Sequence, residues 1–344
     1  MKNRQVTIKD IAQQLAISPA TVSRALKDHP DISKRTKEAV VELATSLNYQ
    51  PNSIALSLRN KKTFTIGVIV PEIIHFFFSS AISGIEDVAY QAGYNVIICQ
   101  SNESYEREVA NINTLLSNRV DGILISVSKN TKDFKHLKKV TEMGVPLIFF
   151  DRVCNEINAH KVIVEDKKGA YEAVKHLIAL GCKRIAHMAG PDTLSISKRR
   201  KEGYIKALTE HGIALDDSLI VLADNQEDGI KAMKRLLAIP NKPDAIFTVN
   251  DNVAVGAIKV IKKTGYKIPE DIAVIGFSDD QKITSLVEPH LSSIAQPAFK
   301  MGQVATELFL RQIEMPEKDD FDEVTLETTL VVRDSSTKSK IETT

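Results

Sequence analysis

Cysteine is scarce in this 344-residue sequence, and tryptophan is absent from it. The three cysteines, Cys99, Cys154 and Cys182, form no C-x-x-C pair, which excludes zinc-ribbon and thioredoxin-like sites. No apolar run approaches the roughly 18–20 residues of a membrane span, and the polar N-terminal segment lacks the apolar region of a secretory signal. We therefore expect a cytoplasmic protein with no disulfide, no metal site and no membrane segment.

The sequence also lacks the short motifs of common catalytic and nucleotide-binding sites. None of its 15 glycines forms G-x-G, and it contains no P-loop, no G-x-S-x-G elbow and no H-E-x-x-H pair. Its eight histidines show no metal-ligand spacing. We therefore predict that the chain is not an enzyme and holds no cofactor, and we assign no catalytic residue.

Charge is distributed unevenly along the chain, although the net charge is only +1. Residues 1–62 contain 11 Lys and Arg against 5 Asp and Glu, whereas the remaining residues contain 34 against 39. A basic N-terminal segment on an acidic body suggests that this segment binds a polyanion. A solvated basic arm would carry the same charge, so the pattern within the segment has to decide between the two.

The first sixty residues contain the signals of two short helices joined by a tight turn. Thr7 can cap a helix, with Asp10 as the second member of a capping box, and an apolar stripe follows at helical spacing. The stripe consists of Ile8, Ile11, Ala12 and Leu15. After a turn at 16–17, Ser18 is a second N-cap and Pro19 occupies the first helical position. This arrangement predicts a helix-turn-helix.

The second of these helices has apolar residues on its inward face and small or cationic residues on its outward face. The outward residues are Pro19, Ala20, Ser23 and Arg24. Small side chains let a helix sit deep in a major groove, and Arg24 can reach a guanine edge or a phosphate. A third helix is predicted from the Ser33 cap to about Leu47. Any small three-helix domain would fit this pattern, but it would not explain the outward residues.

Residues 48–62 indicate a short element between this headpiece and the rest of the chain. Pro51 ends the third helix, and Asn52 can cap a helix of about two turns over 53–59, which is too short to be stable alone. Leu58 beside Arg59 could act as an apolar wedge and a cation in a minor groove. The alternative is a linker whose leucines pack on the body, and the residues by themselves favour the linker.

Two long strings resemble the headpiece and hinge of the lactose-repressor/galactose-repressor (LacI/GalR) family: T-I-K-D-I-A-Q-Q-L-A-I-S-P-A-T-V-S-R-A-L at 7–26 and N-Y-Q-P-N-S-I-A-L-S-L-R at 48–59. The resemblance implies a DNA-binding transcriptional regulator, which we expect to be a repressor rather than an activator. Its hinge helix orders on DNA while Leu58 levers the minor groove open. A helix-turn-helix reads one half-site, so we expect a homodimer on palindromic double-stranded operator DNA. The expected DNA-binding residues are Thr7, Ser18, Pro19, Ala20, Thr21, Ser23, Arg24, Asn52, Leu58 and Arg59.

Beyond residue 63 the sequence alternates short apolar runs with amphipathic stretches. A first set has strands near 65–70, 95–100, 122–127 and 146–150, with helices near 77–92, 105–118 and 132–143. A second set has strands near 184–188, 219–222, 245–249 and 272–276, with helices near 167–180, 197–211, 227–238 and 251–264, and a helix near 298–314 and strands near 322–333 follow. Apolar strands joined by helices form parallel sheets that are covered on both faces. We therefore predict an α/β body of two doubly wound parallel-sheet subdomains.

The body also resembles the LacI/GalR regulatory domain, which is built like a periplasmic sugar-binding protein. The resemblance rests on strings such as I-G-V-I-V-P-E at 66–72, A-I-F-T-V-N-D-N-V-A-V-G-A at 245–257 and I-P-E-D-I-A-V-I-G-F-S-D-D at 268–280. It implies three crossings between the subdomains. The expected divisions are a headpiece at 1–50, a hinge at 51–61, a DNA-proximal subdomain at 62–162 and 294–322, a distal subdomain at 163–293 and 323–338, and a disordered tail at 339–344.

Ligands of open α/β sheets lie beyond the carboxyl ends of the strands, which here means the cleft between the subdomains. Aromatic faces, a few carboxamides and carboxylates, and an arginine suit a polyhydroxylated effector. Arg200 is singled out by the family resemblance alone. The expected effector-binding residues are Phe77, Phe78, Ser101, Asn102, Asp151, Arg152, Arg200, Asn250, Asp251, Ser278, Asp279 and Gln296.

Several of these residues have structural alternatives. Asp151 and Asp251 could cap helices, Arg200 lies in a basic run, and Phe76 beside the predicted aromatic pair is expected to be core. Many members of the family have an aspartate where Ser278 stands, so the residue pattern leaves the effector open. We expect a sugar or sugar derivative. The alternatives are a purine-like effector, control by a protein partner, and a sugar receptor without gene control.

Overall fold

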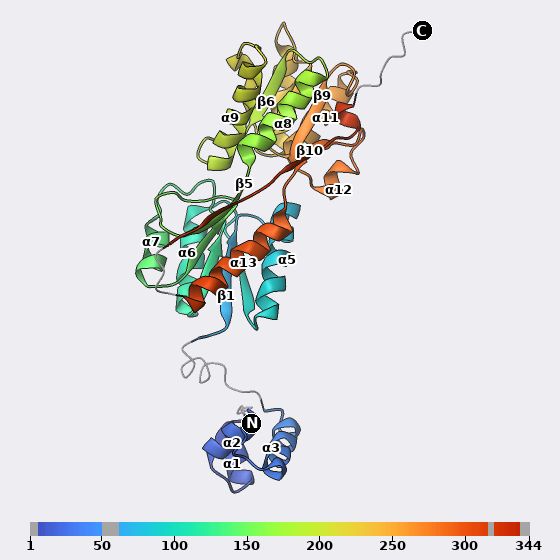
Figure 1. Cartoon of the computed structure of the whole chain (residues 1–344). Helices are drawn as coiled ribbons and strands as arrows, with labels where there is room; N and C mark the ends of the chain where they lie inside the picture. Colours follow the sequence, from blue (N-terminus) through green and yellow to red (C-terminus); the bar gives the residue numbers. More distant parts are fainter. Residues whose placement is uncertain (1–5, 50–61, 316–319, 338–344) are drawn as a thin grey trace. The chain divides into compact units, whose positions relative to one another are not determined.

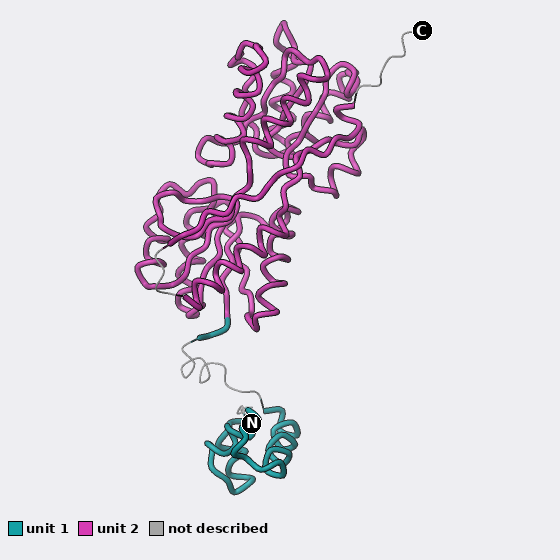
Figure 2. Tube along the Cα trace, in the orientation of Figure 1, with its two compact units in different colours: residues 1–64 teal, residues 65–344 magenta. Residues whose placement is uncertain are grey.

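The computed structural model describes residues 6–49, 62–315 and 320–337. The chain divides into two compact units, residues 1–64 and 65–344 (Figure 2). The predicted hinge at 51–61 and the predicted tail at 339–344 lie outside the described residues, as do Asn52, Leu58 and Arg59.

The first unit contains the three helices that the sequence predicts. They are α1 (Ile8–Gln14), α2 (Pro19–Ala25) and α3 (Lys34–Ser46). Each helix begins at its predicted cap. Thr7 and Asp10 form a capping box, and the hydroxyls of Ser18 and Ser33 each accept a backbone N–H from the first turn of their helix. The positions of the caps therefore fix where the helices start.

Apolar side chains from all three helices fill one small core in this unit. The buried members are Ile11, Ala12, Val22, Ala25, Val40 and Ala44. Ala16, in the turn between α1 and α2, has a left-handed φ of 52°, which gives the turn its sharp reversal. This packing holds the Val22 face of α2 inward, so its opposite face is open.

The second unit contains two six-stranded sheets, one in each of two subdomains (Figure 1). The strands are β1 (Thr65–Val70), β2 (Asn95–Gln100), β3 (Gly122–Ile125), β4 (Leu147–Phe150), β5 (His160–Val164), β6 (Ile185–Ala189), β7 (Ile220–Leu222), β8 (Ala245–Thr248), β9 (Ala273–Ser278), β10 (Ser292–Ala295), β11 (Glu323–Leu326) and β12 (Thr329–Val331). The first sheet has the order β11-β5-β4-β3-β1-β2, and the second has the order β12-β10-β9-β8-β6-β7. Among the described strands, neighbours run parallel except for β10 and β12. Both subdomains therefore have the doubly wound form that the sequence predicts.

Helices cover both faces of each sheet (Figure 1). In the first subdomain, one core contains α5 (Phe76–Gln91) and α13 (Ala298–Glu314), and the other contains α6 (Tyr105–Ser117) and α7 (Lys135–Glu142). In the second, one core contains α8 (Asp166–Ala179) and α9 (Ser195–Glu210), and the other contains α10 (Gln226–Ala238) and α11 (Asp251–Lys263). The short turns are η1 (Asp217–Leu219), α12 (Gln281–Thr284) and η2 (Asp334–Ser336). None of the helices in the described ranges is long and apolar enough to cross a membrane.

Helices α5 and α13 approach each other closely because each has a glycine where they cross. A Cβ atom on Gly84 would overlap the backbone carbonyl of Phe299, and one on Gly302 would overlap the carbonyl of Ala81. Helix α13 starts directly after the chain leaves the second sheet at β10. The glycine contact therefore fastens this returning segment to the first subdomain.

The chain crosses between the subdomains three times, and the structure corrects the predicted boundaries. Strand β5 stays in the first sheet to Val164 instead of leaving after 162, and β10 stays in the second sheet to Ala295 instead of leaving after 293. The largest correction concerns β11, which pairs with β5 in the first sheet although 323–338 were expected in the second. Val324 lies opposite Val162 in this pairing. Hydrogen-bond ladders between strands far apart in sequence set these boundaries, and local patterns do not report them.

Candidate functional sites

The open face of α2 carries several of the residues that the sequence assigns to DNA. Pro19, Ala20 and Arg24 are exposed, whereas Thr21 and Ser23 are half-buried. Pro19 and Ala20 lie in the first turn of the helix, and Arg24 lies in its last turn. Of the four outward positions that the sequence predicts, Ser23 is therefore the one whose side chain is partly covered.

Three hydroxyls that the sequence assigns to DNA also hold the helix starts. Ser18 Oγ accepts the backbone N–H of Thr21 at 3.0 Å and lies 2.8 Å from Thr21 Oγ1. Thr7 Oγ1 donates to the Asp10 carboxylate at 2.6 Å. These bonds fix the starts of α1 and α2. The exposed side chains of Pro19, Ala20 and Arg24 take no part in them.

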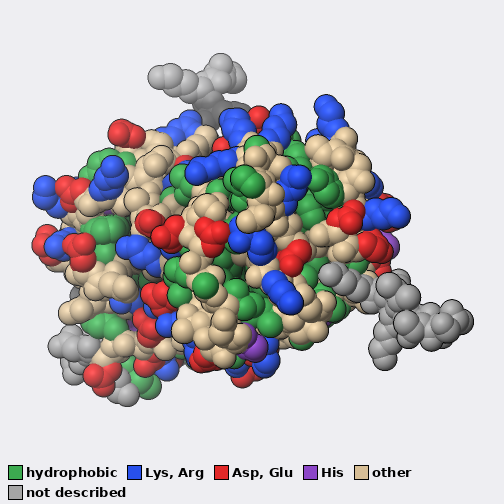
Figure 3. Space-filling model, turned by 90° about the horizontal axis from the view of Figure 1, so that it is seen from above, with side chains coloured by type: hydrophobic (Ala, Val, Ile, Leu, Met, Phe, Trp, Pro, Cys, Tyr) green, Lys and Arg blue, Asp and Glu red, His purple; other side chains and the backbone are tan. Residues whose placement is uncertain are grey.

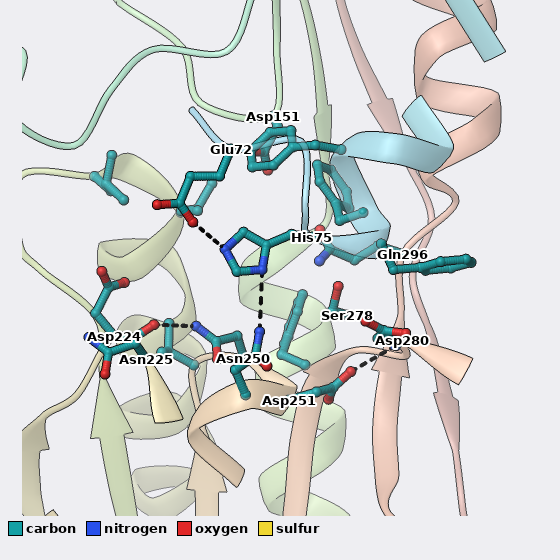
Figure 4. A pocket seen from close by; sticks show the side chains of 18 of the residues that line it. Glu72, His75, Asp151, Asp224, Asn225, Asn250, Asp251, Ser278, Asp280 and Gln296 are labelled. Carbon is teal, nitrogen blue, oxygen red and sulfur yellow. Dashed lines mark hydrogen bonds and ion pairs between the residues drawn. The ribbon is translucent and has the colours of Figure 1, made fainter. Parts of the chain in front are cut away.

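A cavity of about 410 Å³ lies between the two subdomains of the second unit. Its walls are the segments that follow the carboxyl ends of strands in both sheets, including β1, β3, β4, β7, β8 and β9. Figure 4 shows His75 reaching from the first subdomain toward the loop that carries Asn250 and Asp251. The cavity therefore lies where a doubly wound fold is expected to bind a ligand.

The cavity brings together most of the residues that the sequence assigns to an effector. Those that line it are Phe77, Phe78, Asp151, Arg152, Arg200, Asn250, Asp251, Ser278 and Gln296. Phe76 lines it as well and is only half-buried, so the expectation that it is core is wrong. The reason is that α5 starts at Phe76, and its first turn faces the cavity.

Three predicted residues do not line the cavity. Ser101 is fully buried, and Asn102 is exposed in a left-handed turn where its amide oxygen accepts a bond from Gln100. Asp279 pairs with Arg333 at 2.7 Å and accepts a hydrogen bond from Thr284 at 3.1 Å. Those partners hold the Asp279 carboxylate in the second subdomain, away from the cavity.

Arg200 is held rigidly by three neighbours. Its Nε donates to Asp166 Oδ1 at 2.8 Å, and its Nη1 donates to the backbone carbonyl of Val249 at 2.7 Å. Its guanidinium carbon lies 3.7 Å from the centre of the Phe277 ring, a cation–π contact. The Asp166 carboxyl is also buried, and burial raises its pKa against the opposing pull of Arg200. Arg200 thus lies on the cavity wall as a fixed cation, and the alternative that it is merely a solvated member of a basic run is wrong.

Asp151 and Asp251 are buried carboxyls, and burial raises the pKa of each from 3.8 to about 6. Asp151 accepts a hydrogen bond from Ser126 at 3.2 Å. Asp251 accepts bonds from the Ser293 hydroxyl at 2.6 Å and from the backbone N–H of Asp280 at 2.8 Å. Asp251 therefore holds the loop after β9, whereas the Asp151 carboxylate has fewer partners and is the better acceptor for a ligand.

Asn250 begins α11 and joins it to a neighbouring loop. Its Oδ1 accepts the backbone N–H of Val253 at 2.9 Å, and its Nδ2 donates to the backbone carbonyl of Asp224 at 2.9 Å. The side chain thus shapes the cavity wall in addition to facing the cavity.

Two contacts join the subdomains across the cavity, and the sequence reasoning missed the residues that make them. Lys129, after β3, forms an ion pair with Asp224, after β7. The Asn252 amide donates a hydrogen bond to His75 Nδ1 at 3.4 Å, and His75 Nε2 bonds with Glu72 at 2.7 Å. All of these residues follow strand ends, and extending the search by a few residues beyond each strand would have found them.

The loop that carries Lys129 is anchored by a buried carboxylate. Glu108 is fully buried, and its oxygens accept bonds from the backbone N–H of Ser128 at 2.7 Å, from Thr131 at 2.9 Å and from His136 at 2.8 Å. The hydrogen bonds to Glu108 fix the loop after β3, so that Lys129 lines the cavity. Other lining residues that the sequence reasoning missed are Glu103, Leu194, Ile196, Ser197, Asn225, Gln226, Val249, Phe277, Asp280 and Ile283.

The described residues contain no group of three or more His, Cys, Asp and Glu side chains placed to hold a metal ion. The cavity lining combines polar side chains with aromatic and aliphatic ones, which can hydrogen-bond to a ligand and stack on it. A helix-turn-helix unit and a two-subdomain body with such a cavity define the class of ligand-responsive DNA-binding proteins.

Comparison with known families names the class. Residues 63–333 match the description "periplasmic binding proteins and sugar binding domain of LacI family", and residues 7–52 match "bacterial regulatory proteins, lacI family". The chain belongs to the LacI family of bacterial transcription regulators. It is a DNA-binding regulator and not an enzyme.

Individual relatives agree with this assignment. The chain is 35% identical over 308 residues to catabolite control protein A of Priestia megaterium, covering 89% of this chain and 92% of that protein. It is similar in structure to the lac repressor dimer bound to operator and the anti-inducer ONPF, with a TM-score of 0.86, 27% identity, and coverage of 97% and 99% of the two chains. It is also similar to the complex of the transcriptional regulator CelR with cellobiose, with a TM-score of 0.74, 27% identity, and coverage of 96% and 100%.

Proposed function

We propose that this protein is a transcriptional repressor whose affinity for its operator is set by a sugar-like effector bound in the cavity between the subdomains. The observation that carries the proposal is the cavity itself, whose walls come from both subdomains and include Phe77, Asp151 and Arg200. A ligand that contacts both walls changes how the subdomains lie relative to each other. The similar CelR structure is a complex with cellobiose, which supports a carbohydrate as the effector here.

DNA binding is assigned to the first unit. Pro19 and Ala20 are small and exposed at the start of α2, and Arg24 is exposed in its last turn, which suits a recognition helix in a major groove. On the face of the body drawn in Figure 3, cationic and anionic side chains are interspersed. That mixed surface is unlike the single-sign surface that binds a phosphate backbone. Because its target is chromosomal DNA, we infer that this repressor acts in the bacterial cytoplasm.

We also propose that the repressor is a homodimer on a palindromic operator. Strand β2 is an edge of the first sheet, and its Ile97 and Ile98 side chains are 38% and 43% exposed. Tyr90 at the end of the neighbouring α5 is 77% exposed. An apolar edge strand invites pairing with a second chain, and two headpieces are needed to read the two halves of a palindrome.

Operator selection from a random DNA pool with the full-length chain tests the DNA-binding part. We expect a palindromic consensus and a protein of dimeric mass. Arg24→Ala should weaken binding to the selected operator and leave melting of the body unchanged. Equal affinity for the selected sequence and for random DNA would contradict the proposal.

The effector part is tested with the same operator. A panel of neutral pentoses, hexoses and disaccharides is added, and operator affinity and melting temperature are followed together. We expect at least one sugar to change both. Asp151→Asn should abolish the response to that sugar and retain operator binding. If no sugar changes either quantity, the sugar-like effector is refuted while operator binding stands.

A further inference from the structure

Resting on the proposed function, we propose that the effector is rich in hydroxyl groups and carries no negative charge, and that Glu103 and Asp224 enforce this by neutralising the cations Arg152 and Lys129. The cavity is then selective for neutral sugars over the matching uronates and sugar phosphates. Neither carboxylate is among the effector residues expected from the sequence.

The lining of the cavity contains an excess of carboxylates. Among the described residues that line it, six carboxylates face three permanent cations. The carboxylates are Glu72, Glu103, Asp151, Asp224, Asp251 and Asp280, and the cations are Lys129, Arg152 and Arg200. His75 also faces the cavity, and it bonds to Glu72 at 2.7 Å. The formal charge of the lining is therefore negative.

Each of the three cations already has a carboxylate partner. Arg152 Nη1 donates to both Glu103 oxygens, at 2.7 and 3.0 Å, and the two side chains are only 13% and 14% exposed. Lys129 pairs with Asp224 across the cavity. Arg200 pairs with Asp166 at 2.8 Å where both side chains are almost completely buried. An incoming phosphate or carboxylate would have to take a cation away from a partner that already holds it.

Acceptors are among the groups left for a ligand, together with the Arg152 Nε donor, which is buried without a hydrogen-bond partner among the described residues. An ionised carboxylate such as Asp151 can only accept hydrogen bonds. Gln296 lines the cavity, and its Oε1 is buried without a partner among the described residues. A polyol offers O–H donors to both, whereas the charged group of a uronate or a phosphate monoester brings further acceptors. The acceptors available in the cavity and the charge of its lining therefore both favour a neutral polyol.

Burial strengthens this preference. The pKa of Asp151 and that of Asp251 are both raised to about 6 by desolvation, so the cavity already disfavours negative charge on groups that belong to it. A second negative charge a few ångströms away adds like-charge repulsion at reduced dielectric. We expect an anionic sugar to bind at least about tenfold more weakly than its neutral parent.

The deciding experiment frees one cation at a time. Glu103→Gln exposes Arg152, and Asp224→Asn exposes Lys129, with nearly unchanged side-chain shape. The control, Glu307→Gln, frees Lys300, whose ammonium lies 3.7 Å from that carboxylate on the exposed surface of α13. Glucuronate and inorganic phosphate are titrated by calorimetry into full-length wild type and each variant at constant ionic strength, after circular dichroism has verified the fold.

Wild type and Glu307→Gln should bind neither anion measurably, whereas Glu103→Gln and Asp224→Asn should bind glucuronate or phosphate at least about tenfold more tightly than wild type. Wild-type binding of these anions that is as tight as in the variants overturns the proposal. So does a failure of both variants to gain anion binding. A neutral sugar panel without effect would refute the proposed effector instead, and the anion titrations would still decide the charge preference.

Discussion

Replacing Asp151 by asparagine should stabilise the protein relative to wild type, and this gain in unfolding free energy should be larger at neutral pH than at acidic pH. The Asp151 side chain is 6% exposed, and its contacts with Ser126 at 3.2 Å and with Arg152 Nε at 3.8 Å do not offset the loss of water. Burial therefore raises its pKa from 3.8 to about 6. An asparagine side chain at this position would have the same shape and no charge to desolvate.

The magnitude follows from linkage between proton binding and folding. A group whose pKa is higher in the folded chain binds its proton more readily there, so its contribution to stability is greatest at low pH and is lost as the pH rises through about 6. Between pH 5 and pH 7.5, a pKa of about 6 against 3.8 removes about 1 kcal/mol from the unfolding free energy of wild type. Asp151→Asn lacks this loss.

Urea unfolding at pH 5, 6 and 7.5, at one protein concentration and constant ionic strength, measures the effect. The difference in unfolding free energy between Asp151→Asn and wild type should shift by about 1 kcal/mol in favour of the variant between pH 5 and 7.5. Asp192→Asn, on an exposed loop, controls for the loss of one formal charge. A difference that does not change with pH would refute the reasoning, because it would mean that burial does not penalise this carboxylate.

Three further predictions concern the rest of the chain. Gly84→Ala should cost about 1–3 kcal/mol of stability in thermal or urea unfolding, because its Cβ would overlap a backbone carbonyl of α13, whereas Ser83→Ala on the exposed side of α5 should change little. Arg24→Ala should cost about 1–3 kcal/mol of operator affinity if the side chain reads a guanine edge, and an equal loss on random DNA would assign it to a phosphate. Lys129→Met and Asp224→Asn should show a coupling of about 0.5–1 kcal/mol in a double-mutant cycle of unfolding, and a coupling of zero would mean that the ion pair across the cavity contributes nothing.

The three helices of the first unit could be predicted from the sequence because their signals are local. The capping box of Thr7 and Asp10 spans three residues, and Ser18 with Pro19 marks the next start within two. No contact with a distant part of the chain is needed to recognise such signals. The same holds for most strands of the body, whose buried faces make them continuous apolar runs.

The boundaries of the subdomains could not be predicted because distant pairing sets them. Strand β11 belongs to the first sheet only because it lies beside β5, from which it is separated in the chain by strands β6 to β10 and helix α13. Periodicity predicts neither β5 nor β10, since each is a short strand directly before a crossover. A sequence pattern reports how a residue is buried, but it does not report which sheet buries it.

The position of the effector cavity could be predicted, but its composition only in part. The rule that ligands lie beyond the carboxyl ends of parallel strands located Asp151, Asn250 and Ser278 on it. It failed for Asp279, because Arg333 takes that carboxylate as an ion-pair partner from a distant strand end. It also overlooked Lys129, which lies a few residues beyond the end of β3 and pairs with Asp224 of the other subdomain.

The ion pair between Lys129 and Asp224 connects the selectivity for neutral ligands with the closure of the two subdomains around the cavity. Lys129 and Asp224 lie on opposite walls of the cavity, so their contact favours a closed arrangement of the subdomains and also removes one cation from the reach of an anionic ligand. An effector can shift the balance between arrangements only by as much as it binds one better than the other. A hydroxyl-rich ligand that bonds to Asp151 on one wall and to groups of the second subdomain on the other adds to closure without breaking the pair. An anion that recruits Lys129 has to break that pair, so it would oppose the closure on which its own binding depends.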